Sequence, residues 1–340
     1  MDQLSQQNFH QFLSQQAKLN GVQYAAGSNS LNFAVDPAVE QKLEKLIQES
    51  SQFLSRINMY GVRDIKGEKI KMGAGSSVAS RTDTTVNDRA TSDPTDTDAT
   101  MYECAKTNFD THIKYSLMDL WSSHPKFQKM WRDIIVEQIG RDRMTIGFNG
   151  TSRAANTDRA ANPLLQDVNI GWLQKMRDHN EGSQVIDGVT IGAANEFKNI
   201  DALVFAAIND MLDPWHRTRT DNVVICGRNI VTDKYTGFLN DQENNKASER
   251  VATDVLMSTR NLGNTPTIQV PFFPENAIFI TSLSNLSLYW QKQSRRRTIV
   301  DNAKRDQIED YQSVNEDYVI EDMGAGTLIE NITIAEESAA

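Results

Sequence analysis

The sequence is poor in cysteine and has no long apolar run. Cys104 and Cys226 are its only two cysteines in 340 residues, too few for a disulfide framework and typical of a reducing compartment. No stretch approaches the roughly 18 consecutive apolar residues of a membrane-spanning helix. Residues 1–16 lack the basic and apolar regions of a secretion signal. We therefore expect a soluble protein that is made in the cytosol and has no membrane partner.

Positive charge and catalytic motifs are also in short supply. Lys and Arg total 35 against 45 Asp and Glu, a formal net charge of −10, whereas a protein whose main task is to grip nucleic acid concentrates Lys and Arg. The motifs GxxxxGK[ST], GxSxG and HExxH are missing, and the five histidines show no metal-ligand spacing. The sequence predicts no catalytic residue, no cofactor, no metal site and no enzyme.

What is present suffices for a folded core. Apolar residues make up 39% and charged residues 24% of the chain, as in globular proteins. A chain of this length buries about 75% of its unfolded surface. Helical and strand periodicities occur in different segments, so we expect an α+β fold.

The longest predicted element is an amphipathic helix within residues 122–153. Pro125 suits its first helical position and Asn149-Gly150 is a stop signal. About 25 helical residues would span roughly 38 Å, which suits either a core helix or a strut across a flat subunit. The apolar residues recur at helical spacing: Phe127, Trp131, Ile134, Ile135 and Ile139.

Residues 62–115 predict a long extended hairpin. Residues 68–80 form its outgoing limb and residues 101–115 its return, with alternating apolar and polar side chains. The tip, residues 81–100, has Val86 as its only large aliphatic side chain. Such a tip cannot bury enough apolar surface to hold itself in place, so it is either disordered or lies on another molecule. The flanking strands favour docking on a neighbour.

The other segments predict shorter elements. Residues 4–19 indicate a helix, followed by a small-residue linker to residue 33, together an arm outside the main core. Asp36-Pro37 begins a helix that we expect to continue to residue 58. A compact α/β unit is expected from about 160 to 285, with a hairpin at 185–191, helices at 200–212, 229–238 and 249–258, and strands at 223–226, 268–270 and 277–282. Strands are expected at 286–290, 297–300, 318–321 and 328–334, with a loop or short helix in 301–314. The strands of 286–318 would pack against the long helix as a layer that is discontinuous in sequence.

These features describe appendages that have little to bury within one chain. They favour a self-assembling shell or lattice subunit, with a binding module as the alternative. Charged residues on the hairpin tip and in the Arg295-Arg296-Arg297 run can form salt bridges within or between subunits. Our hypothetical intersubunit contacts are Arg81, Asp83, Arg89, Arg295, Arg296 and Arg297.

Several stretches, in their order along nearly the whole chain, resemble the major capsid proteins of peduovirus-type tailed bacteriophages. Each stretch is short, and their shared order makes the resemblance specific. The matching stretches are 48–58 (QESSQFLSRIN), 66–70 (KGEKI), 102–110 (YECAKTNFD), 147–150 (GFNG), 161–175 (ANPLLQDVNIGWLQK), 268–274 (IQVPFFP) and 295–324.

The resemblance implies the Hong Kong 97 capsid fold. Its N-terminal arm would be residues 1–45, with 1–33 a removable, scaffold-like propeptide. The E-loop would be 62–115. The peripheral P-domain would comprise 46–61, 116–154 and 286–318, with a spine helix at 125–150. The axial A-domain would comprise 155–285 and 319–333, leaving 334–340 as a tail. E-loop and arm would both lie across adjacent subunits.

The resemblance also implies the function of a major head protein. Such proteins form hexamers and pentamers that tile an icosahedral shell around double-stranded DNA, and the shell expands on maturation. The implied partners are further copies of the chain, a scaffolding protein and protease, a portal protein, and DNA bound without sequence specificity. The implied location is the virion, after assembly in the host cytoplasm. The alternatives are a non-viral encapsulating compartment of the same fold and a soluble enzyme with an unrecognised site.

Two finer expectations concern processing and crosslinking. We expect trimming of the N-terminus between Phe33 and Ala34, just before the Asp36 cap. Some proteins of this fold crosslink an E-loop lysine to a neighbour's asparagine. Residues 81–100 contain no lysine, so we expect no covalent mesh at the tip.

Overall fold

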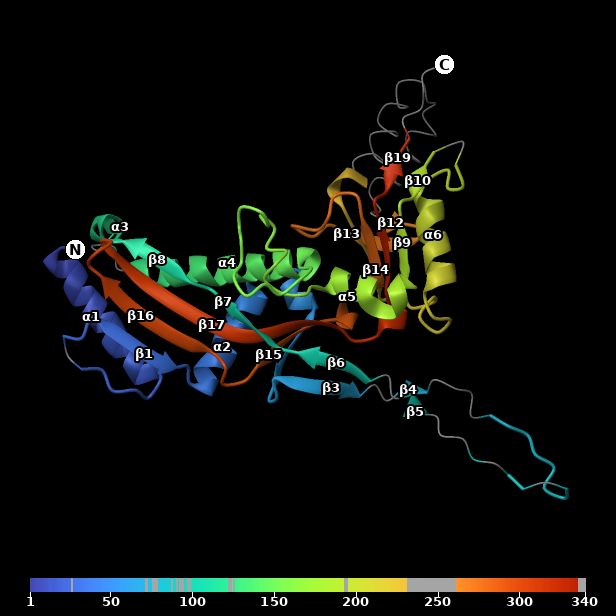
Figure 1. Cartoon of the computed structure of the whole chain (residues 1–340), viewed down its shortest axis with the longest axis horizontal. Coiled ribbons are helices and arrows are strands. Elements are labelled where there is room, and N and C mark those ends of the chain that lie inside the picture. Colours follow the sequence, from blue (N-terminus) through green and yellow to red (C-terminus); the bar gives the residue numbers. More distant parts are fainter. Residues whose placement is uncertain are drawn as a thin grey trace, which may run out of the picture.

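A computed structural model describes the chain apart from residues 26, 71–72, 75–78, 87, 90, 92–94, 97–98, 122–123, 125, 193–194, 231–260 and 336–340. Two sheets, one long helix and a projecting hairpin organise it into an elongated molecule (Figure 1). The helices are α1 (Gln3–Leu19), α2 (Pro37–Glu49), α3 (Tyr115–Trp121), α4 (Phe127–Asn149), α5 (Trp172–Asp178) and α6 (Ile200–Met211), with short 3₁₀ turns η1 (Leu54–Arg56), η2 (His179–Gly182), η3 (Leu283–Asn285) and η4 (Met323–Ala325). The mixture confirms the expected α+β class.

The larger sheet has seven strands drawn from distant parts of the chain. Its order is β1-β16-β17-β15-β2, and β7 and β8 pair with β17 as well. Only β2 and β15 run parallel. Its strands are β1 (Ser30–Ala34), β2 (Asn58–Val62), β7 (Ala105–Asn108), β8 (Thr111–Lys114), β15 (Leu286–Gln291), β16 (Arg296–Asn302) and β17 (Gln307–Ile320).

The loop or short helix expected within 301–314 is only a four-residue turn, and most of that segment is strand. A tight turn at 303–306 joins β16 to β17, and β17 continues for 14 residues. The charged side chains that argued against a strand have partners there. Asp310 pairs with Arg297, and Glu309 accepts hydrogen bonds from Gln307 and Tyr311. Tertiary pairing thus overrides the local polarity.

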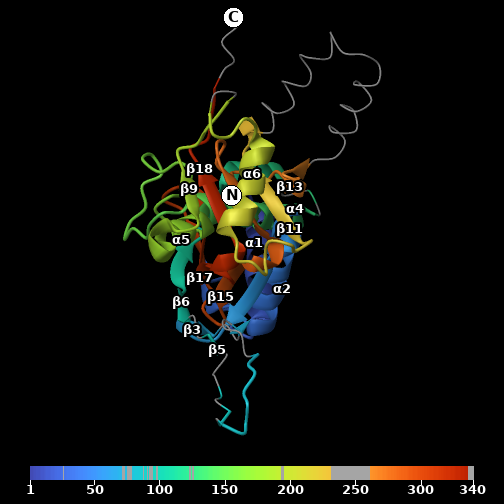
Figure 2. The same cartoon turned by 90° about the vertical axis from the view of Figure 1, so that its right-hand side faces the viewer.

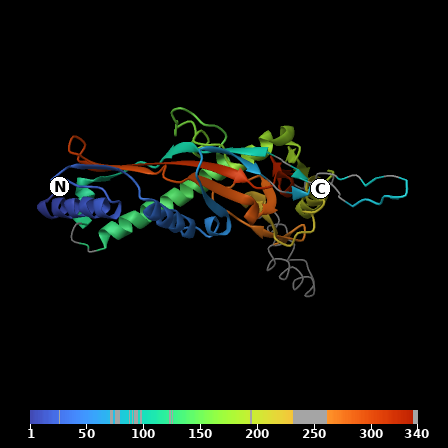
Figure 3. The same ribbon diagram turned by 90° about the horizontal axis from the view of Figure 1, so that it is seen from below.

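Helix α4 lies with α1 and α2 on one face of the seven-stranded sheet (Figure 3). Ile135, Val136 and Ile139 are buried in the core that also holds Leu288 and Val314 of the sheet. This confirms the layer that the sequence predicts to be discontinuous. A Cβ on Gly147 would overlap the Trp172 indole, so the helix needs glycine where α5 crosses it closely.

Two details of the predicted long helix differ. The helix begins at Phe127, with Lys126 before it in a non-helical conformation, and Pro125, the predicted first position, lies outside the described residues. Ile134 is 56% exposed, although its spacing placed it with the buried face. Ile134 therefore points away from the sheet. Ile135 and Ile139 make the buried contacts of the helix instead.

Helix α2 begins as predicted and ends early. The Asp36 carboxylate accepts a hydrogen bond from the Ala38 backbone N–H at 2.8 Å, with Pro37 at the first helical position. The helix stops at Glu49, where the Ser50 hydroxyl donates to the Ile47 carbonyl. The expected continuation to residue 58 is wrong, because the chain forms η1 and then turns into β2.

The smaller sheet has the order β12-β13-β11-β14-β18-β9. Helices α5 and α6 flank it, as Figure 2 shows from the side of the molecule that carries this sheet. Its strands are β9 (Val185–Asp187), β11 (Asn222–Cys226), β12 (Asn261–Leu262), β13 (Thr265–Ile268), β14 (Ile278–Ser282) and β18 (Thr327–Glu330). The buried central strand expected at 223–226 is confirmed, as is the helix at 200–212. The helices expected at 229–238 and 249–258 lie almost wholly outside the described residues.

The hairpin expected at 185–191 is wrong. β9 runs parallel to β18, and β10 (Thr190–Ile191) runs parallel to β19 (Thr333–Ile334). The backbone groups of β9 and β10 therefore form hydrogen bonds with two different strands near the C-terminal end of the chain. A local alternation could not reveal partners more than 140 residues away.

Candidate assembly surfaces

A two-stranded hairpin reaches away from both sheets (Figures 1 and 2). β3 (Lys66–Ile70) pairs with β6 (Ala99–Glu103), and beyond them β4 (Gly73–Ala74) pairs with β5 (Thr95–Asp96). The described part of the tip contacts neither sheet, and its one large aliphatic side chain, Val86, is 76% exposed. Residues 105–114 differ from expectation, because they belong to the seven-stranded sheet as β7 and β8. The projecting part therefore ends at β6.

A buried carboxylate anchors the base of this hairpin. Asp317 accepts a hydrogen bond from the Glu103 backbone N–H at 3.0 Å. The Lys175 ammonium group contacts both carboxylate oxygens of Asp317 at 2.9 Å. Arg153 also reaches Asp317 at 3.2 Å and donates to the Glu103 carbonyl at 2.8 Å. Tyr102 packs edge-on against Tyr289. The hairpin is thus held at its base, whereas the described residues of its tip rest on neither sheet.

The charged residues proposed as intersubunit contacts fall into two groups. Arg81, Asp83 and Arg89 lie on the hairpin tip and are exposed; within the described residues Arg81 and Arg89 make no ion pair, and Asp83 bonds only to Thr85. These positions are open to a second molecule.

In the arginine run, Arg295 does not lie at the surface, as an intersubunit contact would require. Its guanidinium is 1% exposed and contacts Glu44 at 2.5 Å and Gln312 at 3.3 Å, so it has no surface to offer a neighbour. Arg297 pairs with Asp310 of the same chain at 2.7 Å. Arg296 is exposed, and it remains a hypothetical contact.

A buried charge network joins three elements from distant parts of the sequence. Arg143 of α4 contacts Glu44 of α2 at 2.6 Å and Glu316 of β17 at 2.9 Å. Arg295 contacts the same Glu44, and its backbone N–H donates to Glu40. All five side chains are buried. Glu44 and Glu316 therefore share two guanidinium groups inside the protein, and Glu40 accepts from the backbone beside them.

The shared charges shift the pKa values of the carboxyl groups in opposite directions. Burial raises the pKa of Glu44, but the attraction and hydrogen bonds of Arg143 and Arg295 outweigh it and bring the pKa down to about 2. Burial raises the pKa of Glu316, and the attraction of Arg143, with a smaller effect of Arg295, offsets this rise only in part. Sequence analysis missed this network, because Arg143 looked like one more charge on an amphipathic helix. Its position on the apolar face was the available signal.

The N-terminal segment packs on the molecule's own sheet, which corrects the expectation of an arm outside the core with little to bury. Phe9, Leu13 and Ala17 of α1 form a buried cluster with Ile299 and Ile308 of the sheet. β1 pairs with β16, with Phe33 opposite Arg297 and Ala34 opposite Arg296. The proposed cleavage bond thus lies within a paired strand. The small-residue stretch before it provided no local sign of this pairing.

The two cysteines are buried and free. Burial raises the pKa of each thiol to about 12, so neither forms the thiolate that nucleophilic chemistry needs. Among the described helices, none combines the length and apolar character that crossing a bilayer requires.

A long helix laid across a seven-stranded sheet, a second sheet with flanking helices and a projecting hairpin define a shell protein of the Hong Kong 97 type. Solved structures support this class. A chain of the satellite phage P4 procapsid that includes the size determination (Sid) protein superposes with a TM-score of 0.80 at 38% identity, covering 99% of this chain and 100% of that one. The capsid protein of an empty GTA particle has the same fold, with a TM-score of 0.52 at 14% identity over 84% of this chain and 90% of that one.

Sequence comparisons identify the family. The chain belongs to the P2 family of phage major capsid proteins, whose profile matches residues 8–332. It is 41% identical to the capsid protein of Escherichia phage P2 over 99% of this chain and 97% of that one, and 38% identical to the major capsid protein of Serratia phage KSP20 over 99% of each. It is a structural protein of the virion that forms the shell of the phage procapsid from many copies, and it is not an enzyme.

Proposed function

We propose that the chain forms hexamers and pentamers that tile an icosahedral shell around double-stranded phage DNA. The observation that carries this proposal is the projecting hairpin, rooted on Asp317 and without a resting place on its own subunit. A protruding limb with polar, exposed side chains is stable in one position only when another molecule supports it. In a shell, every neighbour is a copy that can do so.

The two sheets support the proposed domain assignment. We assign residues 46–61, 116–154 and 286–318 to the P-domain, and residues 155–285 and 319–333 to the A-domain. The six-stranded sheet with α6 lies within the A-domain segments, whereas the seven-stranded sheet beside α4 combines P-domain strands with β1 from the arm and β7 and β8 from the E-loop segment. Residues 62–115 are the proposed E-loop, with its return limb joining the P-domain sheet. Residues 1–45 are the proposed arm.

We further propose that maturation removes residues 1–33 by cleavage between Phe33 and Ala34. The Asp36 cap of α2 lies just beyond this bond, so the cut would leave that helix intact. Because the bond lies in β1, paired with β16, the protease needs this strand released or not yet docked. N-terminal sequencing of mature particles should give Ala34 as the first residue, and particles that still begin at Met1 would contradict the proposal.

Scaffolding protein with its protease, the portal and the packaged DNA are the proposed partners. The net charge of −10 suits a container, since a wall that neutralised many phosphates would hold DNA by salt-dependent contacts and hinder packing. Precursor shells would then change conformation on maturation.

Electron microscopy of the overexpressed full-length chain, with and without its scaffolding partner, tests assembly. Closed icosahedral shells built from hexamers and pentamers support the proposal. A monodisperse monomer under both conditions argues against it. The nucleic acid content of shells from infected cells separates a DNA container from a protein-loaded compartment.

A further inference from the structure

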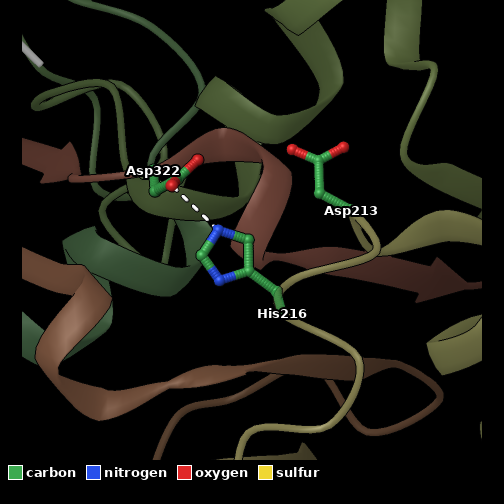
Figure 4. A group of neighbouring side chains, drawn as sticks. All are labelled: Asp213, His216 and Asp322. Atoms are coloured by element: carbon green, nitrogen blue, oxygen red, sulfur yellow. Dashed lines mark hydrogen bonds and ion pairs between the residues drawn. The ribbon is translucent and has the colours of Figure 1, made fainter. Parts of the chain in front are cut away.

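The loop after α6 and the turn after β17 bring three potential metal ligands together. Asp213, His216 and Asp322 each offer one ligand atom, and these atoms lie within 4.8 Å of one another. Figure 4 shows the His216 ring directed at Asp322 with the Asp213 carboxylate beside them. The sequence pattern did not reveal this group, because Asp322 is 106 residues from His216, and an aspartate three residues before a histidine, as at Asp213, is too common a spacing to indicate a metal site.

We propose that Asp213, His216 and Asp322 bind one divalent first-row metal ion. Two carboxylates and one imidazole form a donor set that suits Mn²⁺ and Zn²⁺. Three protein ligands leave the remaining coordination positions for water. This site is independent of the shell-forming function proposed above.

The geometry of the His216–Asp322 pair agrees with two adjacent ligands of one ion. The His216 Nε2 and the Asp322 Oδ2 are 3.0 Å apart. Two ligand atoms that each lie about 2.1 Å from a metal, at right angles to one another, are separated by about 3.0 Å. The ion would replace the proton between these two atoms without moving either side chain far.

Asp213 supplies the second, independent observation. Its carboxylate has no hydrogen-bond donor or cation as partner within the described residues, and a Cβ on Gly324 would overlap its Oδ2. Only glycine at position 324 therefore lets this carboxylate lie against the turn that Asp322 begins. Because the Asp213 carboxylate has no hydrogen bond to give up, a rotation of its side chain would bring it to ligand distance from the proposed ion.

His216 provides a ring that is already in place. It is 7% exposed, and within the described part of the chain its Nδ1 is buried without a hydrogen-bond partner. The protein thus directs Nε2, and not Nδ1, to the carboxylates. The Asn222 side chain donates to the His216 carbonyl at 2.8 Å, and the His216 N–H donates to the Asp213 carbonyl. The loop that carries two of the ligands is therefore held in shape by its own hydrogen bonds.

A bound ion would tie two structural units together. Asp322 accepts a hydrogen bond from the Gly324 N–H at the start of η4, where the chain leaves β17 of the larger sheet and enters the smaller one. Asp213 and His216 belong to the loop after α6, beside the smaller sheet. The ion would stiffen the joint between the sheets.

Titration of the unassembled full-length chain with MnCl₂, followed by the electron paramagnetic resonance signal of free Mn²⁺, tests the proposal. We expect one saturable site per chain, from which Zn²⁺ displaces Mn²⁺ more effectively than Mg²⁺ does, because imidazole favours Zn²⁺. Asp213→Asn should weaken Mn²⁺ binding at least about 10-fold and leave the metal-free melting curve unchanged, since no partner is lost.

Asp210→Asn is the matched control. Asp210 is exposed on the last turn of α6 and lies outside the group, so this variant should bind Mn²⁺ like the unchanged chain. His216→Gln should also lose the site, which keeps the test decisive if Asp213→Asn folds poorly. Absence of a saturable site, or equal Mn²⁺ affinity in both cluster variants and the control, would overturn the proposal.

Discussion

Arg143 connects the arm, the long helix and the larger sheet through Glu44 and Glu316. Its guanidinium is fully buried, so Glu316 depends on it for compensation of its charge, and Glu44 is compensated by Arg143 together with Arg295. Removing one member of such a group leaves buried charges without partners, which costs more than the intact group contributes. The network is therefore a point of vulnerability for the folded subunit.

We predict that Arg143→Leu lowers the free energy of unfolding of the unassembled subunit by about 3–5 kcal/mol. Urea unfolding followed by tryptophan fluorescence measures it. Arg141→Leu is the matched control: Arg141 lies on the same helix, is exposed, and pairs with Glu137 one turn earlier. That change should cost only about 0.3–0.5 kcal/mol. Equal effects of the two substitutions would rule out the special role of Arg143.

Glu44 makes a separate prediction about acid. Its pKa is about 2 in the folded chain against 4.5 ordinarily, so the folded state favours the ionised form. The resulting stability is fully present above pH 4.5 and is lost as the pH falls toward 2. Glu44→Gln removes this group, so the free energy of unfolding of the variant should fall less steeply between pH 4.5 and pH 2 than that of the unchanged chain. Parallel curves over this range would contradict the assignment.

At the scale of elements, the hairpin and the N-terminal segment behave in opposite ways. The hairpin is fastened only at its base, whereas α1 and β1 are packed along their length on the larger sheet. We therefore expect the hairpin tip to contribute to contacts between subunits, and the N-terminal segment to contribute to the stability of its own subunit until the proposed trimming.

Replacing residues 79–91 by a Gly/Ser linker of equal length should abolish shell formation and leave the melting temperature of the unassembled subunit unchanged. The physical reason is that the described side chains of this tip, Val86 included, are nearly all exposed and bury little within the subunit. Calorimetry and electron microscopy of the same preparation measure the two outcomes. A lowered melting temperature would show that the tip packs on its own chain.

At the scale of the whole molecule, we expect the stability of the shell to rest on many noncovalent contacts. Each lateral contact need only be of ordinary size, about 1,600 Å², because every subunit makes several. No lysine lies between residues 81 and 100, and the lysines nearest in sequence lie on or near the hairpin base, such as Lys66, whose ammonium pairs with Glu103 at 2.6 Å. The tip thus has no amine for a crosslink to a neighbour.

Denaturing electrophoresis of mature shells should accordingly show monomers. The chain will migrate at its own mass, or at that of residues 34–340 if trimming has occurred. A ladder of multimers resistant to boiling in detergent would contradict this expectation and indicate a crosslink from another lysine.

Elements with strong local signals were predictable. Asp36 and Pro37 specify the start of α2 by capping and backbone geometry alone, and the spacing of Ile135 and Ile139 identifies the buried face of α4. The run at 223–226 predicts a central strand because a strand with apolar side chains on both faces is stable only when both faces are buried. The hairpin was predictable from what its tip lacks, an apolar side chain to bury.

Other features depend on partners far away in the chain. β17 looked like a charged loop until Arg297 and Gln307 supplied partners for its acidic side chains, and α1 looked detached until Ile299 and Ile308 covered its apolar stripe. Glu44, Arg143 and Glu316 are spread over more than 250 residues.

The sequence alone determined the α+β class, the long helix, the projecting hairpin and the character of a shell protein, because periodicity, caps and the absence of apolar residues act within a few neighbouring residues. Only the tertiary structure decided that the N-terminal segment lies on its own sheet, that charges are shared at Arg143, and that Asp213, His216 and Asp322 meet. Those outcomes depend on which distant surfaces exclude water together, and no local pattern of residues specifies that choice.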